Sequence, residues 1–387
     1  MHLFLYDNLL QLDSIVPVIN TIKGQKKITI SSLNITHNYS NNKLIKYLNQ
    51  NDIECLTFPP TNIENRIKLF LIRTLLLLPK IILSRFQGFW YRLDEKTFLD
   101  KKKFLNFLKE KKIKSINIPN DFASNKKIFL YNLKLEYDLK IIEIEVGLRT
   151  LKTDPYEKFP LDYCDFYLAT NKFLSFQGFK NKKEFNRKTK FLGSSRYSSQ
   201  WIKILDEINK IPYKKTEKIN VALFLAPRNF EENPNLLNKI LKIENINLKI
   251  SNKPKSILPL KCCDFYYDKF NTNQLINWAD IIICHATSIV IEAIIKKKKI
   301  LFCSFIKYDK KFKILGNRIE IFNCVKKMQN LEEIIENIAN FDPEIIEEQN
   351  IFFDKDDQSA LYQLRGFSND EEMIKNYINF YENAIIG

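Results

Sequence analysis

The chain has 387 residues, 45% of them hydrophobic and 27% charged, and carries a formal net charge of +16 at pH 7. Its length exceeds the size at which a single hydrophobic core keeps growing, so two domains are expected, and its ordinary apolar content excludes an intrinsically disordered chain. The positive charge attracts polyanions, but no zinc-finger or RNA-binding motif accompanies the basic runs, so we predict no nucleic-acid partner.

The cysteines and histidines argue against a disulfide framework and against a metal site. Seven cysteines are scattered without a C-x-x-C pair, which indicates reduced thiols and a cytoplasmic protein. His2, His37 and His285 stand too far apart in the sequence for a recognisable metal site, and we predict neither a metal nor a cofactor. The first residues turn polar at once and are interpreted as a strand and not as a signal peptide.

In the first half of the chain, short apolar runs alternate with amphipathic stretches. This alternation places helices between successive strands, which is typical of a parallel sheet with right-handed crossovers. Strands are predicted over 3–6, 27–30, 116–118 and 141–146, and helices over 12–23, 42–50 and 127–135.

A polar run at residues 212–218 interrupts this pattern and is interpreted as a linker. Strands are predicted beyond it over 219–225, 247–250, 281–284 and 300–303, with a helix over 288–295. We therefore predict an α/β fold of two Rossmann-like domains whose parallel sheets face a central cleft. The expected boundaries are 1–200 and 215–360, followed by a C-terminal helix in 361–387 that packs back on the first domain.

The segment 66–92 combines apolar runs with regularly placed Lys and Arg side chains. Its longest uncharged stretch is far shorter than the roughly 20 residues needed to cross a bilayer. An apolar surface framed by cations suits an anionic membrane interface. A buried pair of helices broken at Pro79 explains the pattern equally well, and the sequence leaves both interpretations open.

The sharpest pattern is a buried strand that ends at Cys284, a short polar turn over 285–288 and a helix that begins at Thr287 or Ser288. The start of a helix offers free backbone N–H groups to an anion, and serine and threonine hydroxyls can cap the helix or donate to a phosphate. Glu292, one turn further, suits a ribose diol. The alternative is a capped crossover helix without a ligand.

Two cationic side chains follow other strands of the second half. Arg228 comes after the strand 219–225, and Lys253 comes after the strand 247–250. Because ligands of open α/β sheets bind beyond the strand ends, both are candidates for phosphate binding.

In the first half, carboxylates follow two predicted strands. Asp121 comes after the strand 116–118 and Glu145 follows residues 141–144. A partly desolvated carboxylate facing a cleft suits general acid or base catalysis, whereas pairing with Arg149 or capping of a helix would be a structural role. Gly193 and Ser194 form a flexible turn near the domain junction.

Residues 145–150 read E-V-G-L-R-T, which is similar to the E-A-G-L-R-T signature of the non-hydrolysing UDP-N-acetylglucosamine 2-epimerases, a family with the GT-B fold. Further segments follow in that family's order between residues 110 and 310. The resemblance implies a GT-B-like fold and acids at Asp121, Glu145 and Glu157. It also implies a nucleotide-binding helix at 288–293.

Two segments depart from the epimerase pattern. Residues 6–10 read Y-D-N-L-L where the epimerases have G-T-R-P-E, and residues 285–288 read H-A-T-S where they have D-S-G-G. The second turn is closer to those of polysaccharide glycosyltransferases, and the Lys253-Pro254 turn resembles the K-x-H-P turn of enzymes that build surface glycans or teichoic-type polymers. These departures favour sugar transfer over epimerisation.

The leading hypothesis is a metal-independent GT-B glycosyltransferase of bacterial surface-polysaccharide synthesis, for capsule or lipopolysaccharide. We expect a nucleotide-sugar donor in the second domain, and a glycan or lipid-linked acceptor in the first, where Asp121, Glu145 or His37 would act as base. The expected location is cytoplasmic, with 66–92 as a contact to the inner face of the plasma membrane. The substrate-binding candidates are Arg149, Gly193, Ser194, Arg228, Lys253, His285, Thr287, Ser288 and Glu292.

Two other hypotheses stay open. The first is a sugar-nucleotide epimerase or hydrolase that uses Asp121, Glu145 and Glu157 as its acids. The second is a non-catalytic scaffold that binds a membrane or a nucleic acid through its positive charge.

Overall fold

The structure is a computed structural model. It describes residues 1–24, 27–32, 41–57, 101–122, 124–146, 163–171, 182–210, 217–224, 239–240, 242–251, 271–285, 287–306, 319, 322–342 and 355–383.

The first sheet has seven strands in the order β3-β2-β1-β4-β5-β6-β7, and every neighbouring pair is parallel. The reversal of strand order between β1 and β4 is that of the Rossmann fold. The strands are β1 (His2–Tyr6), β2 (Ile28–Ser32), β3 (Glu54–Thr57), β4 (Ser115–Pro119), β5 (Lys140–Ile144), β6 (Phe166–Ala169) and β7 (Thr189–Phe191).

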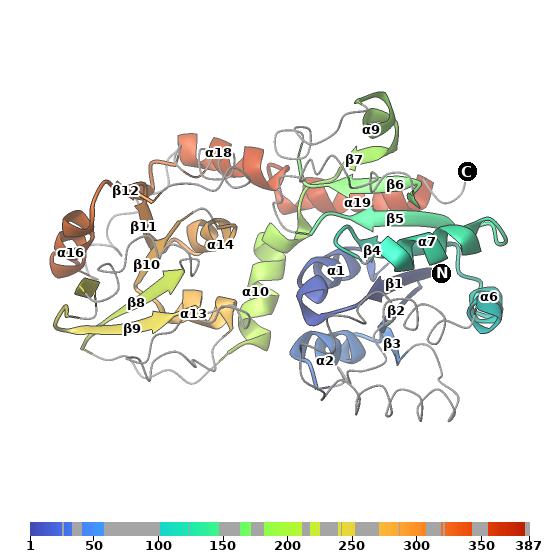
Figure 1. The fold of residues 1–387 in the computed structure, drawn as a ribbon, viewed down its shortest axis with the longest axis horizontal. Coiled ribbons are helices and arrows are strands. Elements are labelled where there is room, and N and C mark those ends of the chain that lie inside the picture. The colour runs from blue at the N-terminus through green and yellow to red at the C-terminus, as the bar shows by residue number, and fades with distance from the viewer. Residues whose placement is uncertain are drawn as a thin grey trace, which may run out of the picture.

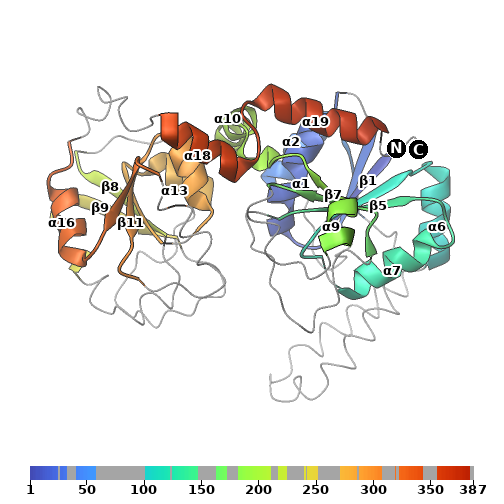
Figure 2. The same cartoon turned by 90° about the horizontal axis from the view of Figure 1, so that it is seen from above.

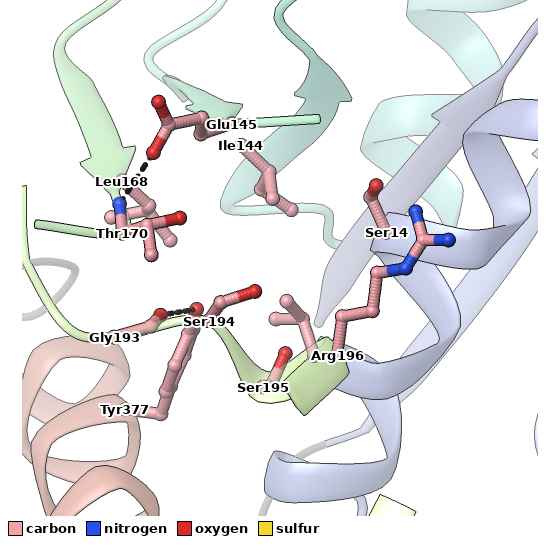
Figure 3. A pocket seen from close by; sticks show the side chains of 11 residues that line it. Ser14, Ile144, Glu145, Leu168, Thr170, Gly193, Ser194, Ser195, Arg196 and Tyr377 are labelled. Atoms are coloured by element: carbon pink, nitrogen blue, oxygen red, sulfur yellow. Dashed lines mark hydrogen bonds between the residues drawn. The ribbon is translucent and has the colours of Figure 1, made fainter. Parts of the chain in front are cut away.

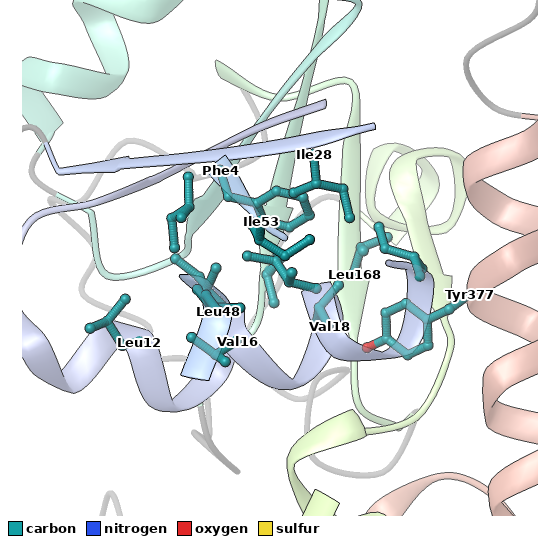
Figure 4. Close-up of a cluster of buried hydrophobic side chains, with 14 of the residues drawn as sticks. Phe4, Leu12, Val16, Val18, Ile28, Leu48, Ile53, Leu168 and Tyr377 are labelled. Atoms are coloured by element: carbon teal, nitrogen blue, oxygen red, sulfur yellow. The ribbon is translucent and has the colours of Figure 1, made fainter. Parts of the chain in front are cut away.

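Helices cover both faces of this sheet, which is why its strands are nearly continuous runs of buried residues. One face packs against α1 (Leu9–Ile22), α2 (Lys43–Gln50) and α19 (Asp370–Asn383), and the core between them is shown in Figure 4. The other face packs against α6 (Lys101–Glu110), α7 (Ser124–Lys134) and α9 (Lys182–Lys188). Side chains alternate between the two cores, with Phe4 in the first core and its neighbours Leu3 and Leu5 in the second.

The second sheet has five described strands in the order β12-β11-β10-β8-β9, and all its pairs are parallel. Its strands are β8 (Ile219–Phe224), β9 (Ile246–Ile250), β10 (Ile281–Cys284), β11 (Lys299–Cys303) and β12 (Val325–Met328). Helices α13 (Thr272–Trp278), α14 (Ile289–Ile295) and α18 (Lys355–Arg365) cover one face, and α16 (Leu331–Ala339) covers the other. Two parallel sheets with helices on both faces confirm the predicted α/β fold class.

The two sheets lie side by side, and the chain passes between them twice (Figures 1 and 2). The first connection is the short helix η3 (Ser195–Tyr197) followed by α10 (Ser199–Ile208). The second is the turn between α18 and α19, where Gly366 has a φ of +83° and an added Cβ atom would lie 2.0 Å from the carbonyl oxygen of Thr170. Only glycine fits such a backbone and such an approach.

Beyond this turn, α19 is attached to the first sheet. The Tyr381 hydroxyl donates to Asn117 Oδ1 of β4 at 2.7 Å, and the ring of Phe380 meets that of Phe166 edge-on at 5.3 Å. The last described helix therefore forms part of the core of the first sheet, while α18 belongs to the core of the second. No helix in the described ranges is long and apolar enough to span a membrane, and the segment 66–92 lies outside those ranges.

Candidate functional site

Open parallel sheets bind ligands beyond the carboxyl ends of their strands, at the point where the strand order reverses. In the first sheet this point lies between β1 and β4, and in the second it lies between β8 and β10. The segments that follow these strands are therefore the first places where a ligand is expected.

Asp121 lies at the reversal point of the first sheet, just beyond β4. Its Oδ1 accepts a hydrogen bond from Gln11 Nε2 of α1 at 3.1 Å, and Gln11 Oε1 accepts from the Asp7 backbone N–H at 2.7 Å. Asp7 in turn forms an ion pair with Lys126 of α7. Gln11 thus links the ends of β1 and β4, and the partly buried Asp121 carboxylate is held at this edge of the sheet.

A small polar pocket lies next to this edge, at the ends of β5, β6 and β7 (Figure 3). The space in it that water can occupy is about 10 Å³, which is room for roughly one water molecule. Apart from apolar side chains of the sheet and of α1, its lining is Ser14, Glu145, Thr170, Gly193, Ser194, Ser195, Arg196 and Tyr377.

Glu145 is the carboxylate of this pocket and is 6% exposed. Its backbone N–H donates to the carbonyl oxygen of Leu168 at 3.0 Å, and its Oε2 accepts from the backbone N–H of Thr170 at 2.5 Å. Both bonds connect it to the end of β6, the neighbouring strand. The backbone of Glu145 and its carboxylate are therefore each held by a main-chain group of β6 or its end, which is a rigid way to orient a catalytic acid or base.

Hydroxyl groups form much of the remaining wall. Ser14 Oγ of α1 is buried and has no hydrogen-bond partner among the described residues. The Tyr377 hydroxyl of α19 donates to the carbonyl oxygen of Gly193 at 2.9 Å. Gly193 has a φ of +84°, and an added Cβ would lie 2.6 Å from the ring of Phe367, so the turn after β7 requires glycine.

The helix η3 joins this pocket to the second sheet. Arg196 lines the pocket opposite Glu145 in Figure 3, and one of its guanidinium nitrogens lies 4.0 Å from Asp13 Oδ2 of α1. The next residue, Tyr197, is buried in the core of the second sheet. Its hydroxyl has no hydrogen bond of ordinary geometry to a described residue. Burial raises the pKa of this phenol, and the nearby Arg196 and Ser288 side chains partly oppose the rise.

At the reversal point of the second sheet, the residues after β10 lead into α14. His285 is buried and stacks on Phe302 with ring centroids 5.7 Å apart. Ser288 is the N-cap of α14, yet its side chain makes no capping hydrogen bond. Glu292 is 6% exposed, and its Oε1 accepts from Asn273 Nδ2 at 2.8 Å and pairs with Lys296 at 3.1 Å.

The charges of the two halves act on one another. Desolvation by the protein around it raises the pKa of the Asp13 carboxyl, although 44% of its side chain is exposed. Arg196 opposes this rise, and the negative charge of Glu292 adds to it. Burial lowers the pKa of the Arg196 guanidinium, but Tyr197 and the carboxylates of Asp13 and Glu292 more than offset this and raise it. Groups of α1, η3 and α14 therefore share one electrostatic environment.

The candidate residues from the sequence fall into three groups. Glu145, Gly193 and Ser194 line the pocket, and Asp121 lies at the neighbouring strand end. Ser288 and Glu292 lie near Tyr197 of η3, and Thr287 directly precedes Ser288, whereas His285 is buried against Phe302. His37, Arg149, Glu157, Arg228 and Lys253 lie outside the described residues.

The structure also adds residues that the sequence did not single out, namely Ser14, Thr170, Arg196 and Tyr377. Arg196 directly follows Gly193, Ser194 and Ser195 in the chain, so its position after that turn was a usable signal. Tyr377 lies 184 residues beyond Gly193, its partner in the pocket, and no local pattern reveals such a contact. Within the described ranges, no group of three or more His, Cys, Asp or Glu side chains is arranged to hold a metal ion.

No protein-family model matches the chain, and no curated protein sequence matches it significantly. Solved structures do match over its whole length. The complex of S. aureus MnaA with UDP matches 100% of this chain and 98% of its own, with a TM-score of 0.56 and 11% sequence identity. A UDP-N-acetylglucosamine 2-epimerase matches 99% of this chain and 96% of its own, again with a TM-score of 0.56 and 11% identity.

The wall teichoic acid polymerase TagF, in a structure with CDPG, matches 100% of this chain and 88% of its own with a TM-score of 0.51 and 11% identity. The chain has the GT-B fold. An epimerase and a teichoic acid polymerase thus both match this arrangement of two parallel sheets, and at 11% identity the match defines the fold alone.

Proposed function

We propose that this chain is a GT-B glycosyltransferase that takes a nucleotide-activated sugar as donor and that Glu145 is its catalytic base. The observation that supports it most directly is the position of η3. This helix carries Arg196 on the wall of the Glu145 pocket and Tyr197 beside Ser288 at the start of α14. A carboxylate of the first half and the predicted ligand-binding edge of the second half therefore flank the same three residues.

In the proposed reaction, Glu145 accepts the proton of an acceptor hydroxyl while the oxygen of that hydroxyl bonds to the anomeric carbon of the donor sugar. The bond from that carbon to the diphosphate breaks, and its electron pair leaves with the nucleoside diphosphate. In this proposal Arg196, on the wall of the pocket, stabilises the negative charge that develops on the diphosphate. Asp121 is the second candidate for the base. Arg228 and Lys253 remain proposed phosphate ligands.

A second function, epimerisation or hydrolysis of a sugar nucleotide, is favoured by one specific observation. Glu145 begins the run of six residues that resembles the epimerase signature, and a UDP-N-acetylglucosamine 2-epimerase is among the structures that match the whole chain. In that function Asp121, Glu145 and Glu157 would move protons on the sugar itself, and no acceptor would be needed.

The experiment is incubation of the purified protein with UDP-, CDP- and GDP-sugars, followed by phosphorus NMR and chromatography of the nucleotides. Nucleoside diphosphate that appears only when a glycan or lipid-linked acceptor is added supports transfer. Turnover of the sugar nucleotide alone supports the epimerase or hydrolase. If no sugar nucleotide raises the melting temperature of the protein in a thermal-shift series, transfer and epimerisation or hydrolysis are both excluded.

Two variants test the separate roles of Glu145 and Glu292 in the proposed reaction. Glu145→Gln keeps the shape of the side chain and removes the base, so kcat is expected to fall by about 10²–10⁴-fold with little change in donor KM. Glu292→Gln is expected to act in the opposite way and raise donor KM by about tenfold, the equivalent of 1.4 kcal/mol of binding. Equal effects of the two variants on kcat would contradict the division of labour between the halves.

A further inference from the structure

A group of polar side chains, three of them buried and one partly buried, lies beneath the ends of β4, β5 and β6, outside the pocket. Tyr167 belongs to the core on one face of the sheet, whereas Ile144 and Leu168, which line the pocket, belong to the core on the other face. The group consists of Asn120, Lys127, Glu143 and Tyr167, joined by hydrogen bonds.

Asn120 is the centre of this group and bonds through both its backbone and its side chain. Its backbone N–H donates to the carbonyl oxygen of Ile144 at 2.8 Å, and its carbonyl oxygen accepts from Lys127 Nζ at 2.8 Å. Its side-chain Nδ2 donates to the Tyr167 hydroxyl at 3.2 Å, and its Oδ1 accepts from the Val146 backbone N–H at 3.1 Å. One residue thus connects the turns after β4 and β5 to β6.

Lys127 and Glu143 form an ion pair below Asn120. Their charged atoms lie 3.1 Å apart, and their side chains are 6% and 0% exposed. Glu143 Oε1 has no hydrogen-bond partner among the described residues. Hydrophobic replacements of a buried ion pair are often equally stable, so stability alone is a weak reason for such a pair. A better reason for this pair is that Lys127 holds the carbonyl oxygen of Asn120 in place.

We propose that Asn120, anchored by Lys127, is a positioning residue that sets the separation of the Asp121 and Glu145 carboxylates. Asn120 directly precedes Asp121, and its side chain holds the amide that directly follows Glu145. The inference rests on the proposed function, because the separation matters only if these carboxylates act on a substrate.

Position matters to this degree because the reacting atoms must lie in line. A misplacement of about 1 Å far from the chemistry can lower a rate by about 10²-fold. Thr170 fixes Glu145 from the side of β6, and Gln11 fixes Asp121 from the side of α1. Asn120 belongs to the turn that carries Asp121 and bonds to the backbone on both sides of Glu145.

The test compares Asn120→Ala with a control in the strand that leads into it, Asn117→Ala of β4. Asn117 is fully buried, donates to the carbonyl oxygen of Leu3 at 3.2 Å and accepts from the Tyr381 hydroxyl at 2.7 Å, but it bonds to neither carboxylate turn. Both variants lose side-chain hydrogen bonds at the first sheet, Asn117 on the face of Tyr381 and Asn120 on the face of Tyr167, and both are expected to melt at lower temperature. Only Asn120→Ala is expected to lower kcat, by about 10²-fold, with donor KM within about twofold of wild type.

Two further measurements separate positioning from general damage. Hydrogen exchange of the Val146 amide is expected to accelerate in Asn120→Ala and to stay unchanged in Asn117→Ala, because only the first variant removes its acceptor. Asn120→Asp keeps an acceptor for that amide and is expected to recover part of kcat.

Equal losses of kcat in Asn120→Ala and Asn117→Ala, in an enzyme whose wild type is active, would overturn this inference and leave the proposed function standing. A wild type that turns over no sugar nucleotide, with or without acceptor, would overturn the proposed function and this inference with it.

Discussion

The two halves of the candidate site are assembled differently. In the second half, His285, Ser288 and Glu292 belong to one short run of the chain, and the strand and helix around them fix their positions. In the first half, Ser14, Glu145 and Tyr377 come from segments far apart in the sequence and meet only in the folded protein. A ligand site that a local motif builds is readable from sequence, whereas one that tertiary contacts build is not.

The first half of the site is also held by hydrogen bonds to the segment that joins α18 to α19, whereas the second half is built around β10 and α14. The backbone N–H of Ser194 donates to the carbonyl oxygen of Arg365 at 2.8 Å, and Asn171 Nδ2 donates to that of Leu364 at 2.7 Å. These bonds place Gly366 against Thr170 and direct α19 to Gly193. Weakening this crossing between α18 and α19 should therefore disturb the first half of the site and leave the second half in place.

The variant Gly366→Ala is expected to have the largest effect on stability. Its φ of +83° is strained for alanine, and the new Cβ would lie 2.0 Å from a backbone oxygen, which cannot move aside easily. Positive φ costs about 1–2 kcal/mol, and the backbone overlap brings the expected loss to roughly 3–5 kcal/mol. Denaturant unfolding of the purified variant measures it.

Gly24→Ala is the matched control for this prediction. No atom lies within 4 Å of the Cβ that it would add, so its unfolding free energy should stay within about 0.5 kcal/mol of wild type. If Gly366→Ala were as stable as Gly24→Ala, the crossing would not constrain the pocket, and the first half would be less dependent on distant segments than its contacts indicate.

The sequence predicted the fold to the extent that local patterns determine it. Alternating strands and helices, and the buried run 281–284, lie close to where they were expected, because continuous apolar strands between capped helices are a local signal. Glu145 and Ser288 could be selected because they follow strands. Ser14 could not, because nothing within α1 shows that its hydroxyl faces the end of a strand more than a hundred residues away. Glu143 looked like one polar residue in an apolar strand, and its partner Lys127 becomes apparent only once α7 is packed.

The ion pair beneath the first half predicts a dependence of stability on pH. Burial, opposed by Lys127 and Lys188, raises the pKa of Glu143 from 4.5 to about 7. Between those values the folded chain holds a proton that the unfolded chain has lost, so stability falls as pH rises, by about 3 kcal/mol over the window. Cys164 also faces Glu143, and burial raises the pKa of its thiol, so it stays neutral throughout.

The double variant Lys127→Met/Glu143→Met removes both charges and should remove this dependence. Urea unfolding at pH 5 and pH 8 is expected to show wild type losing stability relative to the variant at the higher pH, and a variant as stable as wild type or more so at pH 8. If the difference in unfolding free energy between wild type and the variant stayed constant from pH 5 to pH 8, Glu143 would titrate near its ordinary value. Water would then reach the ion pair of Lys127 and Glu143.

The smallest expected effect is the most direct test of how the first half is assembled. Ser14 Oγ is buried without a partner among the described residues, so the folded chain bears the cost of its desolvation, and Ser14→Ala should stabilise the ligand-free protein by about 1 kcal/mol. Ser198→Ala is the control with the opposite sign, because Ser198 caps α10 by accepting from the Trp201 N–H at 3.1 Å, and its loss should cost about 1 kcal/mol. Substrate affinity should fall in Ser14→Ala and stay unchanged in Ser198→Ala, as isothermal titration would measure. A Ser14→Ala protein that is more stable and still binds substrate as well as wild type would mean that the pocket beside Glu145 takes no part in binding, and the contrast between a locally built half and a distantly built half would no longer describe a functional site.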